Sequence, residues 1–395
     1  MKSQRISVVI CAYTEKRWSQ ILAAVDSVCA QSVPPEEIIV VVDHNRALFT
    51  GLTAALPHIQ VVENFGAPGL SGAKNTSLAL FRGDVVAFLD DDAVADSDWL
   101  RFFTETLADP RAIGVGGLVL PLWETEHPRW FPAEFDWVVG CNYLRMPRSR
   151  AMVRNLMGGN MSLRREAFDL VGGFRNGIGR STDKRPFGCE DTEFCIRLSQ
   201  RSPKSKLLFD CRAVIRHVVP ASRCRFSYFL SRCFGEGLSK AAVAASVGTA
   251  DGLSDERYYT TRILPRAIAQ DIIELLDGDL WGLARAGAIV VGLATTAAGY
   301  AAGSLRRRSG PMTIGALRPG SGQAKGGDDT SSRHDRSVRP GGPGPQGHED
   351  GDAFRQQYGR EPSWPWAPPP TRTGIGAVGT GSLSSANSHR MLGTD

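Results

Sequence analysis

The sequence predicts an α/β fold with a mainly parallel sheet, on the basis of two observations. Short apolar runs of strand length alternate with segments of helical spacing through the N-terminal part of the chain. Acidic residues also follow two of these runs, Asp43 after one and the triplet 90–92 after another. Strands that alternate with helices indicate a parallel sheet, and such sheets bind ligands beyond the carboxyl ends of their strands. We therefore expect a binding site where these acids lie.

The expected elements follow from apolar spacing and from glycine or proline at their ends. In the first part of the chain we expect strands at 5–12, 37–43, 59–63 and 84–89, and helices at 18–30, 46–56, 73–81 and 97–107. A glycine-rich loop, 66–72, precedes the third of these helices. In the second part we expect strands at 112–120, 158–163, 207–210 and 213–219, and helices at 165–171, 190–199, 226–247 and 257–276.

The acidic triplet 90–92 points to a metal ion. Three adjacent carboxylates at the edge of a buried sheet repel one another and resist loss of water. A divalent cation removes this repulsion, and Mg²⁺ or Mn²⁺ leaves room for phosphate oxygens. Asp90 and Asp92 lie two positions apart, so extended backbone places their side chains on the same side. The alternative is an acidic turn that caps the helix expected near Asp98.

Composition sets limits on the class of protein. The chain has 395 residues, 42% of them hydrophobic, which is enough for a sizeable core with one or two domains. The net charge of +5 is too small to indicate a nucleic-acid partner, and we expect none. The eight cysteines form no Cys-x-x-Cys pair, which predicts reduced thiols and not a disulfide framework. The first residues read as a strand and not as a signal peptide, so we expect a cytoplasmic protein.

The C-terminal part divides into two segments. We expect a first domain over 1–250, a helical extension over 251–305, and a disordered Gly/Pro-rich tail over 306–395. Residues 281–303 are apolar and long enough to cross a bilayer, but they contain Arg285. A span would also place the arginine run 306–308 outside, against the positive-inside tendency. We expect this segment to pack on the preceding helices or to lie at the inner face of the plasma membrane, with a true span as the alternative.

Several short motifs occur in a fixed order along the chain: VVICAY (8–13), VVD (41–43), GAKN (72–75), FLDDD (88–92), GGNMS (158–162), GGF (172–174), ED (190–191) and His217 after a strand. Together, over residues 5–245, they resemble glycosyltransferase family 2. The resemblance implies a GT-A fold, a nucleotide-diphosphate sugar donor, a Mn or Mg ion, and inversion at the anomeric carbon. The acceptor would be a glycan, a lipid-linked molecule or a small molecule, in the synthesis of cell-surface glycans or glycoconjugates.

The resemblance also implies roles for single residues. Asp191 would be the catalytic base with Glu190 beside it, and Asp92 with His217 would bind the metal. The donor would be bound by Asp43 at its base, by Lys74 at its diphosphate, by Asp90 and Asp91 near its ribose or sugar, and by the loop Gly158, Gly159 and Asn160 below the sugar. Lysine stands at position 74 where the family often has arginine, and it meets a diphosphate as a point charge without the bidentate fork.

Each of these residues also has a purely structural interpretation. Asp43 and the glycine pair fit ordinary turns, and Lys74 fits a solvated helix start. Acids at a helix start, such as Glu190 and Asp191, are common partners of the helix dipole. His217 fits a buried histidine whose ring nitrogens are satisfied.

Two other functions compete with glycosyl transfer. A nucleotidyltransferase would need a phosphate loop rich in glycine and lysine after the first strand, and residues 11–17 contain no glycine. A non-catalytic module that binds a nucleotide sugar or a metal would not need the acidic pair 190–191.

Overall fold

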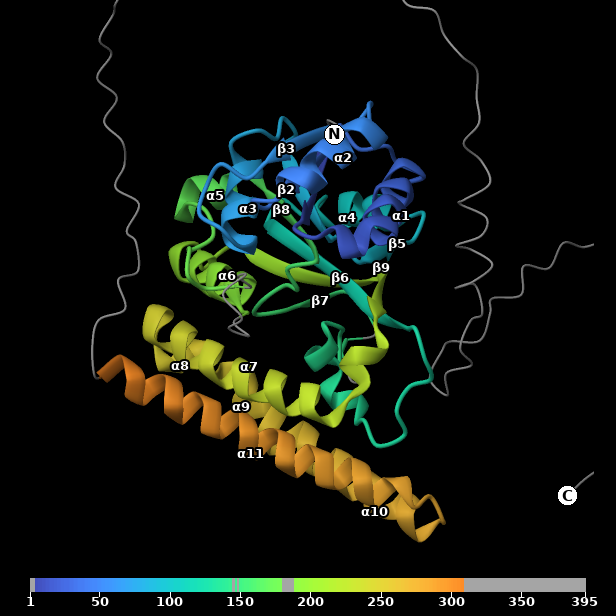
Figure 1. Ribbon diagram of the computed structural model, residues 1–395. Helices are drawn as coiled ribbons and strands as arrows, with labels where there is room; N and C mark the ends of the chain where they lie inside the picture. Colours follow the sequence, from blue (N-terminus) through green and yellow to red (C-terminus); the bar gives the residue numbers. More distant parts are fainter. Residues whose placement is uncertain (1–3, 144–145, 148, 180–187, 309–395) are drawn as a thin grey trace, which may run out of the picture. The chain divides into compact units, whose positions relative to one another are not determined.

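The computed structural model describes residues 4–143, 146–147, 149–179 and 188–308. Within these residues nine strands form one sheet, in the order β3-β2-β1-β4-β8-β6-β9-β5, with β7 beside β9 (Figure 1). The strands are β1 (Ile6–Ala12), β2 (Glu37–Val42), β3 (Gln60–Glu63), β4 (Val85–Asp90), β5 (Ala93–Ala95), β6 (Ala112–Trp123), β7 (Ala151–Met152), β8 (Asn160–Arg164) and β9 (Lys206–Val219).

The sheet is parallel in its N-terminal half and mixed beyond it. Strands β1 to β4 pair in parallel, whereas β8 runs antiparallel to both β4 and β6. Strand β9 is parallel to β6, and both β5 and β7 run antiparallel to β9. The predicted α/β fold class is confirmed. The antiparallel pairing of β6 with β8 agrees with the connection between them, because parallel neighbours need a crossover, usually a helix, and no α-helix lies in the described residues between these two strands.

The helices flank this sheet and continue beyond it. They are α1 (Trp18–Cys29), α2 (Arg46–Ala55), α3 (Leu70–Leu78), α4 (Trp99–Thr106), α5 (Arg165–Val171), α6 (Glu190–Arg201), α7 (Phe226–Val247), α8 (Thr249–Gly252), α9 (Ser254–Tyr258), α10 (Leu264–Leu276) and α11 (Trp281–Arg308). A 3₁₀ helix, η2 (Ala133–Val139), and a π-helical turn, Tyr259–Ile263, complete the elements that reach the site.

Several elements differ from the sequence prediction: β5 and β7 were not expected, and the expected helix 257–276 divides into α9, the π-helical turn and α10. Two further differences have a local cause. Helix α3 begins inside the expected glycine-rich loop, where a Cβ on Gly72 would lie only 1.7 Å from the carbonyl oxygen of Ala67. Glycine is needed there for the backbone to pass this close. Strand β9 is continuous where two strands were expected, because a register shift against β6 between Gly117 and Leu118 absorbs the irregular residues.

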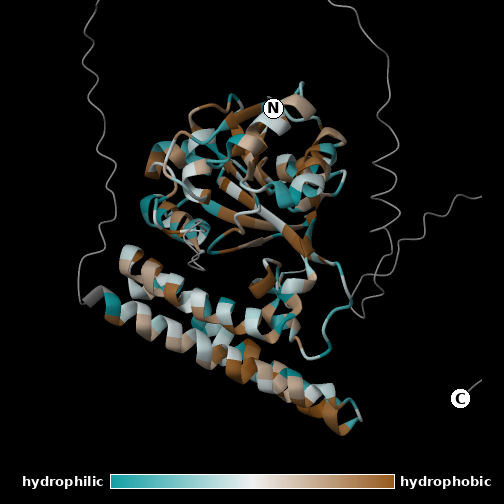
Figure 2. Ribbon diagram, viewed as in Figure 1, coloured by the Kyte–Doolittle hydropathy of each residue, from teal (hydrophilic) through white to brown (hydrophobic). Residues whose placement is uncertain are grey.

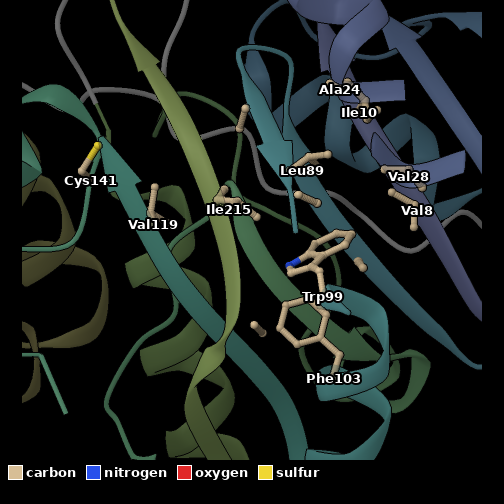
Figure 3. Packing of buried hydrophobic residues seen from close by; sticks show 14 of the residues in the cluster. Val8, Ile10, Ala24, Val28, Leu89, Trp99, Phe103, Val119, Cys141 and Ile215 are labelled. Carbon is tan, nitrogen blue, oxygen red and sulfur yellow. The ribbon is translucent and has the colours of Figure 1, made fainter. Parts of the chain in front are cut away.

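Apolar side chains alternate between the two faces of the strands and form a core on each side. On one face Val8, Ile10 and Leu89 pack with Ala24 and Val28 of α1, and Trp99 and Phe103 of α4 extend this cluster (Figure 3). On the other face Phe88 packs edge-on against Phe174, with ring centroids 5.7 Å apart. The central strands are thus covered on both sides, and their ligand-binding groups lie only at the strand ends.

All eight cysteines are free thiols, in agreement with the predicted absence of a disulfide framework. Cys141, Cys195 and Cys233 are buried, whereas Cys29 is exposed. Cys29 is in the last turn of α1, after Val28, the last buried residue of that helix.

Helix α11 contains the apolar segment 281–303 and packs along α7 (Figure 1). Contact is so close that a Cβ on Gly299 would lie 2.1 Å from the carbonyl oxygen of Phe234. The charge of Arg285 is neutralised by α10 and the turn after it, with Asp271 at 2.7 Å, Glu274 at 2.5 Å and Asp279 at 3.0 Å.

By length and composition alone, the stretch from Trp281 to Arg306 could cross a membrane. The expected tail was placed from 306 onward, but residues 306–308 belong to α11, and the remainder, 309–395, lies outside the described residues.

Candidate active site

A cavity of about 1250 Å³ lies beyond the carboxyl ends of β1, β2 and β4. Most of the predicted site residues line it, although they come from distant parts of the chain: Asp43, Asp90, Asp91, Asp92, Gly158, Gly159, Glu190 and Asp191. The other three, Lys74, Asn160 and His217, are buried behind this lining. The structure thus gathers all eleven predicted residues around one cavity.

The triplet forms the turn between β4 and β5. Asp90 ends β4, and the chain turns through Asp91 and Asp92 before Ala93. Asp90, Asp92 and His217 each place one ligand atom within 4.8 Å of the others. His217 comes from β9, which pairs with β5 so that His217 lies opposite Ala93. Its Nε2 lies 3.1 Å from Oδ1 of Asp92.

These residues fit a divalent cation. Oδ2 of Asp91 and Nδ1 of His217 are buried and have no hydrogen-bond partner within the described part of the chain. Buried polar atoms rarely remain unpartnered, and a bound ion or an ordered water is the usual partner of such atoms. Carboxylate oxygens with one imidazole suit Mn²⁺, and carboxylates also suit Mg²⁺. Asp90, which we expected at the sugar, is therefore also a potential metal ligand.

Two arginines that sequence reasoning missed pair with the triplet. Arg17 donates from Nη1 to Oδ1 of Asp91 at 2.5 Å and lies 2.9 Å from Oδ2 of Asp92. Arg223 lies 3.4 Å from the same Oδ2. Both follow strands, Arg17 after β1 and Arg223 after β9, so their position beyond strand ends was the only signal available in the sequence.

The pKa values of Asp91 and Asp92 are shifted in opposite directions by their surroundings. Burial, together with the charges of Asp92 and Asp90, raises the pKa of Asp91 to about 7, although Arg17 opposes the shift. For Asp92 burial acts in the same direction, but His217 and Arg17 outweigh it and hold the pKa below its usual range. Asp92 therefore stays ionised across the physiological range.

Asp43 is held in a fixed orientation at the end of β2. Its Oδ1 accepts a hydrogen bond from Nδ2 of Asn64 at 2.6 Å, and its Oδ2 accepts one from the backbone N–H of Gly69 at 2.8 Å. Gly69 has a φ of 106°, a conformation that favours glycine. The carboxylate is 8% exposed and faces the cavity.

The backbone of Gly158 and Gly159 packs directly against the side chains of Asp90, Asp191 and Lys74. A Cβ on Gly159 would lie 2.1 Å from Oδ2 of Asp90, and one on Gly158 would lie 2.7 Å from Nζ of Lys74. Neither position has room for a side chain. Asn160 is wholly engaged inside the protein: it accepts from Nε1 of Trp99 at 2.7 Å and donates to two backbone carbonyls. Its side chain therefore anchors the loop.

Helix α6 begins with the acidic pair. Oδ2 of Asp191 accepts a hydrogen bond from the backbone N–H of Gly158 at 2.6 Å, which links the helix to the glycine loop. Glu190 pairs with Lys74, whose Nζ lies 3.2 Å from Oε1. The preceding residue, Cys189, has a φ of 70°, which is uncommon for a residue other than glycine and marks the start of α6 as strained.

Asp191 has the properties of a base that works near neutral pH. Burial and the charge of Glu190 raise its pKa to about 6, while Lys74 and the backbone N–H of Gly158 oppose the shift. A carboxylate with this pKa is ionised at pH 7 and is more basic than an exposed aspartate. Because it lines the same cavity as the candidate metal ligands Asp90 and Asp92, it lies where an acceptor could lose a proton.

Comparison with known sequences identifies relatives over most of the described chain. Residues 7–172 match the sequence profile of glycosyl transferase family 2. The glucosyl-dolichyl phosphate glucuronosyltransferase of Haloferax volcanii is 34% identical over 240 residues, which cover 60% of this chain and 76% of that protein. The succinoglycan biosynthesis protein ExoM of Rhizobium meliloti is 27% identical over 241 residues, covering 59% and 72%.

Comparison with solved structures supports the fold. The mannosyltransferase PcManGT from Pyrobaculum calidifontis, solved in complex with GDP-Man and Mn²⁺, superimposes with a TM-score of 0.50. The match covers 78% of this chain and 88% of that one at 19% sequence identity. The architecture is that of GT-A glycosyltransferases, as the sequence predicted.

Proposed function

The chain belongs to glycosyltransferase family 2, and we propose that it transfers a sugar from a nucleotide-diphosphate sugar to an acceptor hydroxyl with inversion at the anomeric carbon. One observation carries this proposal: the metal-ligating group Asp90, Asp92 and His217 and the basic carboxylate of Asp191 surround a single cavity. The first suits a leaving diphosphate, and the second suits an attacking hydroxyl.

The donor occupies the strand-end side of the cavity. Asp43, held by Asn64 and Gly69, accepts a hydrogen bond from the nucleotide base. The backbone of Gly158 and Gly159, packed against Lys74 and Asp90, lines the place of the sugar. Support comes from PcManGT, which was solved with GDP-Man and Mn²⁺. A Mn²⁺ or Mg²⁺ ion held by Asp90, Asp92 and His217 would offset the negative charge of the diphosphate.

The reaction is a single displacement. The acceptor hydroxyl gives its proton to the carboxylate of Asp191, and its oxygen forms the new bond to the anomeric carbon. The bond from that carbon to the phosphate oxygen breaks, and its electron pair leaves with the nucleoside diphosphate. Attack from the side opposite the leaving group inverts the anomeric centre. Asp191 is oriented for this by the backbone N–H of Gly158, and general-base action contributes about 10²–10⁴-fold.

The acceptor we propose is lipid-linked, and the product contributes to cell-surface glycans or glycoconjugates. The Haloferax relative acts, by its name, on a glucosyl-dolichyl phosphate, and the Rhizobium relative serves succinoglycan biosynthesis. We place the protein at the inner face of the plasma membrane, attached through α11. The ribbon of α11 is coloured mainly white to brown, the apolar part of the scale (Figure 2). Its exposed residues include Leu283, Val290 and Leu305, at 65%, 55% and 62%.

A donor panel tests the proposal. Purified full-length protein is mixed with UDP-, GDP- and dTDP-sugars with and without Mn²⁺, and the thermal shift is recorded, since a ligand that binds only the native state raises the melting temperature. We expect at least one donor to stabilise the protein in a metal-dependent way. Asp92→Asn should remove this shift, and Asp169→Asn, at an exposed position on α5, should retain it.

Transfer itself separates an enzyme from a non-catalytic module that binds a nucleotide sugar. With the donor found above, Asp191→Asn should lower transfer by about 10²–10⁴-fold and leave the donor-induced shift unchanged. Metal-dependent donor binding without transfer or hydrolysis in the wild-type protein would favour the non-catalytic module. Donor binding that persists in a folded Asp92→Asn variant would contradict the metal assignment.

A further inference from the structure

The cavity does not end at Asp191 but continues between the C-terminal helices. One row on α7 faces it at intervals of four residues, namely Tyr228, Arg232, Glu236 and Lys240. Leu293, Thr296, Ala297 and Tyr300 of α11 face it at helical spacing, and Tyr258 to Thr260 and Ile263 close a third side. Residues of α7, of α11 and of the segment 258–263 thus line a part of the cavity that lies away from the strand ends, where we place the donor.

The part of this extension next to Asp191 is charged. Nζ of Lys240 lies 3.3 Å from Glu236 and 2.5 Å from Glu256, and Arg154 lies 2.8 Å from Glu256. Sγ of Cys189, at the start of α6, lies 3.3 Å from Oε1 of Glu236, so these four residues adjoin the acidic pair. We call Arg154, Glu236, Lys240 and Glu256 the charged belt. Its closely spaced donors and acceptors suit a polar, hydroxyl-rich group.

Other walls of the same extension are aromatic and apolar. Trp137 donates from Nε1 to the hydroxyl of Tyr259 at 3.1 Å, and that hydroxyl donates to the carbonyl oxygen of Glu134 at 2.6 Å. Because these polar atoms are satisfied within the protein, the two rings offer mainly carbon to the cavity. Leu293 and Ile263 add aliphatic surface. We call this part the apolar chamber, defined by Trp137, Tyr259, Ile263, Leu293 and Ala297.

The apolar chamber reaches the protein surface. Ala297 lines the cavity and is exposed, and Tyr258, which also lines it, is 60% exposed. A molecule bound with one end at Asp191 can therefore contact the charged belt, which adjoins Cys189, and also the apolar chamber, whose lining includes the exposed Ala297. A cavity with both polar and apolar walls matches a ligand that is itself polar at one end and apolar along its length.

We propose that the charged belt and the apolar chamber form the acceptor site, and that the acceptor is a sugar joined to a long aliphatic chain. This inference rests on the proposed function and specifies its acceptor. The sugar lies at the charged belt with a hydroxyl toward Asp191, and the chain follows the apolar chamber to the opening at Ala297. The exit beside the exposed apolar face of α11 lets the remainder of the chain stay in lipid.

A chain-length series tests the site without knowledge of the natural acceptor. Binding of methyl, butyl, hexyl and octyl β-glucosides to the full-length protein is measured by calorimetry below their micellar concentrations. Each buried methylene should tighten binding about two- to fourfold. Ala297→Trp, which fills the opening, should remove most of this gain. Ala298→Trp, at the neighbouring exposed position outside the cavity lining, should preserve it.

Two outcomes would overturn the inference. Binding that is independent of chain length in the wild-type protein would show that no chain is bound. A chain-length gain that is equal in both tryptophan variants would place the chain on the outer surface. Mn²⁺-dependent nucleotide binding, measured on the same samples, separates this inference from the proposed function. If the wild-type protein binds no nucleotide, the proposed function is contradicted. If it binds nucleotide but its affinity for glucosides does not depend on chain length, only the acceptor site is contradicted.

Discussion

Nζ of Lys74 lies 3.2 Å from Oε1 of Glu190 in a pair whose side chains are only 2% and 6% exposed. Sequence position had suggested that Lys74 meets the donor diphosphate. In the structure its ammonium lies beneath Gly158 and close to the rings of Phe88 and Phe174, at 5.5 and 5.1 Å. Burial lowers the pKa of Lys74, but Glu190, Asp191 and Asp90 outweigh this and raise it, so the lysine stays charged.

We predict that the ammonium of Lys74 stabilises the buried carboxylates of Glu190 and Asp191. Lys74→Met should lower the free energy of unfolding by about 3–5 kcal/mol, because it leaves Glu190 buried and unpaired. Glu190→Gln should also destabilise, and the double variant should recover much of the loss, which denaturant unfolding in a double-mutant cycle measures. A Lys74→Met protein that is as stable as wild type but fails to bind nucleotide would instead support the donor role.

A second prediction concerns pH. Because burial and Glu190 raise the pKa of Asp191 to about 6, and the base acts only when ionised, transfer should fall about tenfold per pH unit below 6 and level off above it. The measurement is the pH profile of single-turnover transfer at saturating donor. The residual activity of Asp191→Asn should show no such step. A wild-type profile that is flat from pH 4.5 to 7 would exclude Asp191 as the base.

The sequence predicted those parts of the site that local chain order determines. Asp90 to Asp92 end a strand, and the strand's apolar run is visible in the sequence. Pairings between distant segments could not be predicted from the sequence. Arg17 pairs with Asp91, 74 positions away, and Lys74 pairs with Glu190, 116 positions away. An arginine after a strand has the same local signature whether it pairs with an acid or points to water, so only the packed structure distinguishes the two.

The cavity extension was missed for a related reason. The row Tyr228, Arg232, Glu236 and Lys240 has ordinary helical spacing, and the sequence predicted the helix itself with the bounds observed, Phe226–Val247. This row lines the cavity because α11 and the π-helical turn lie opposite it. Their position depends on close contacts between helices, such as the one at Gly299. Such contacts between helices are set by tertiary packing, which local spacing does not encode.

The third prediction concerns the glycine loop. A Cβ on Gly159 would lie 2.1 Å from Oδ2 of Asp90, so Gly159→Ala should displace that carboxylate. Displacement of a positioned group by about 1 Å can cost 10²-fold, and we expect a loss of about that size in metal-dependent transfer. Gly287→Ala on α11 is the matched control, since no atom lies within 4 Å of its Cβ position. Equal transfer by the two variants would show that Asp90 tolerates the shift.

The last prediction concerns the attachment of α11. Its outward face carries Leu283 and Val290, 65% and 55% exposed, whereas the charge of Arg285 is already neutralised by α10 and its following turn. A helix that packs along α7 on one side and exposes apolar residues on the other can lie in the membrane interface without crossing it. The variant Leu283→Glu/Val290→Glu should therefore lose binding to lipid vesicles, measured by flotation. Leu170→Glu, at an exposed leucine of α5, should float like the wild-type protein.

Extraction of membranes with high salt and with alkaline carbonate distinguishes this interfacial attachment from a membrane-spanning helix. The arginine run 306–308 is at the end of α11, and its attraction to anionic lipid is screened by salt over about one Debye length. Wild-type protein in cell membranes should thus be released in part by high salt and fully by alkaline carbonate. Protein that remains in the pellet after both treatments, with its C-terminal end cut by protease from outside the cell, would establish that α11 crosses the bilayer. That result would require α11 to leave α7, because the exposed face of α11 covers only part of its circumference and the rest is in contact with the protein.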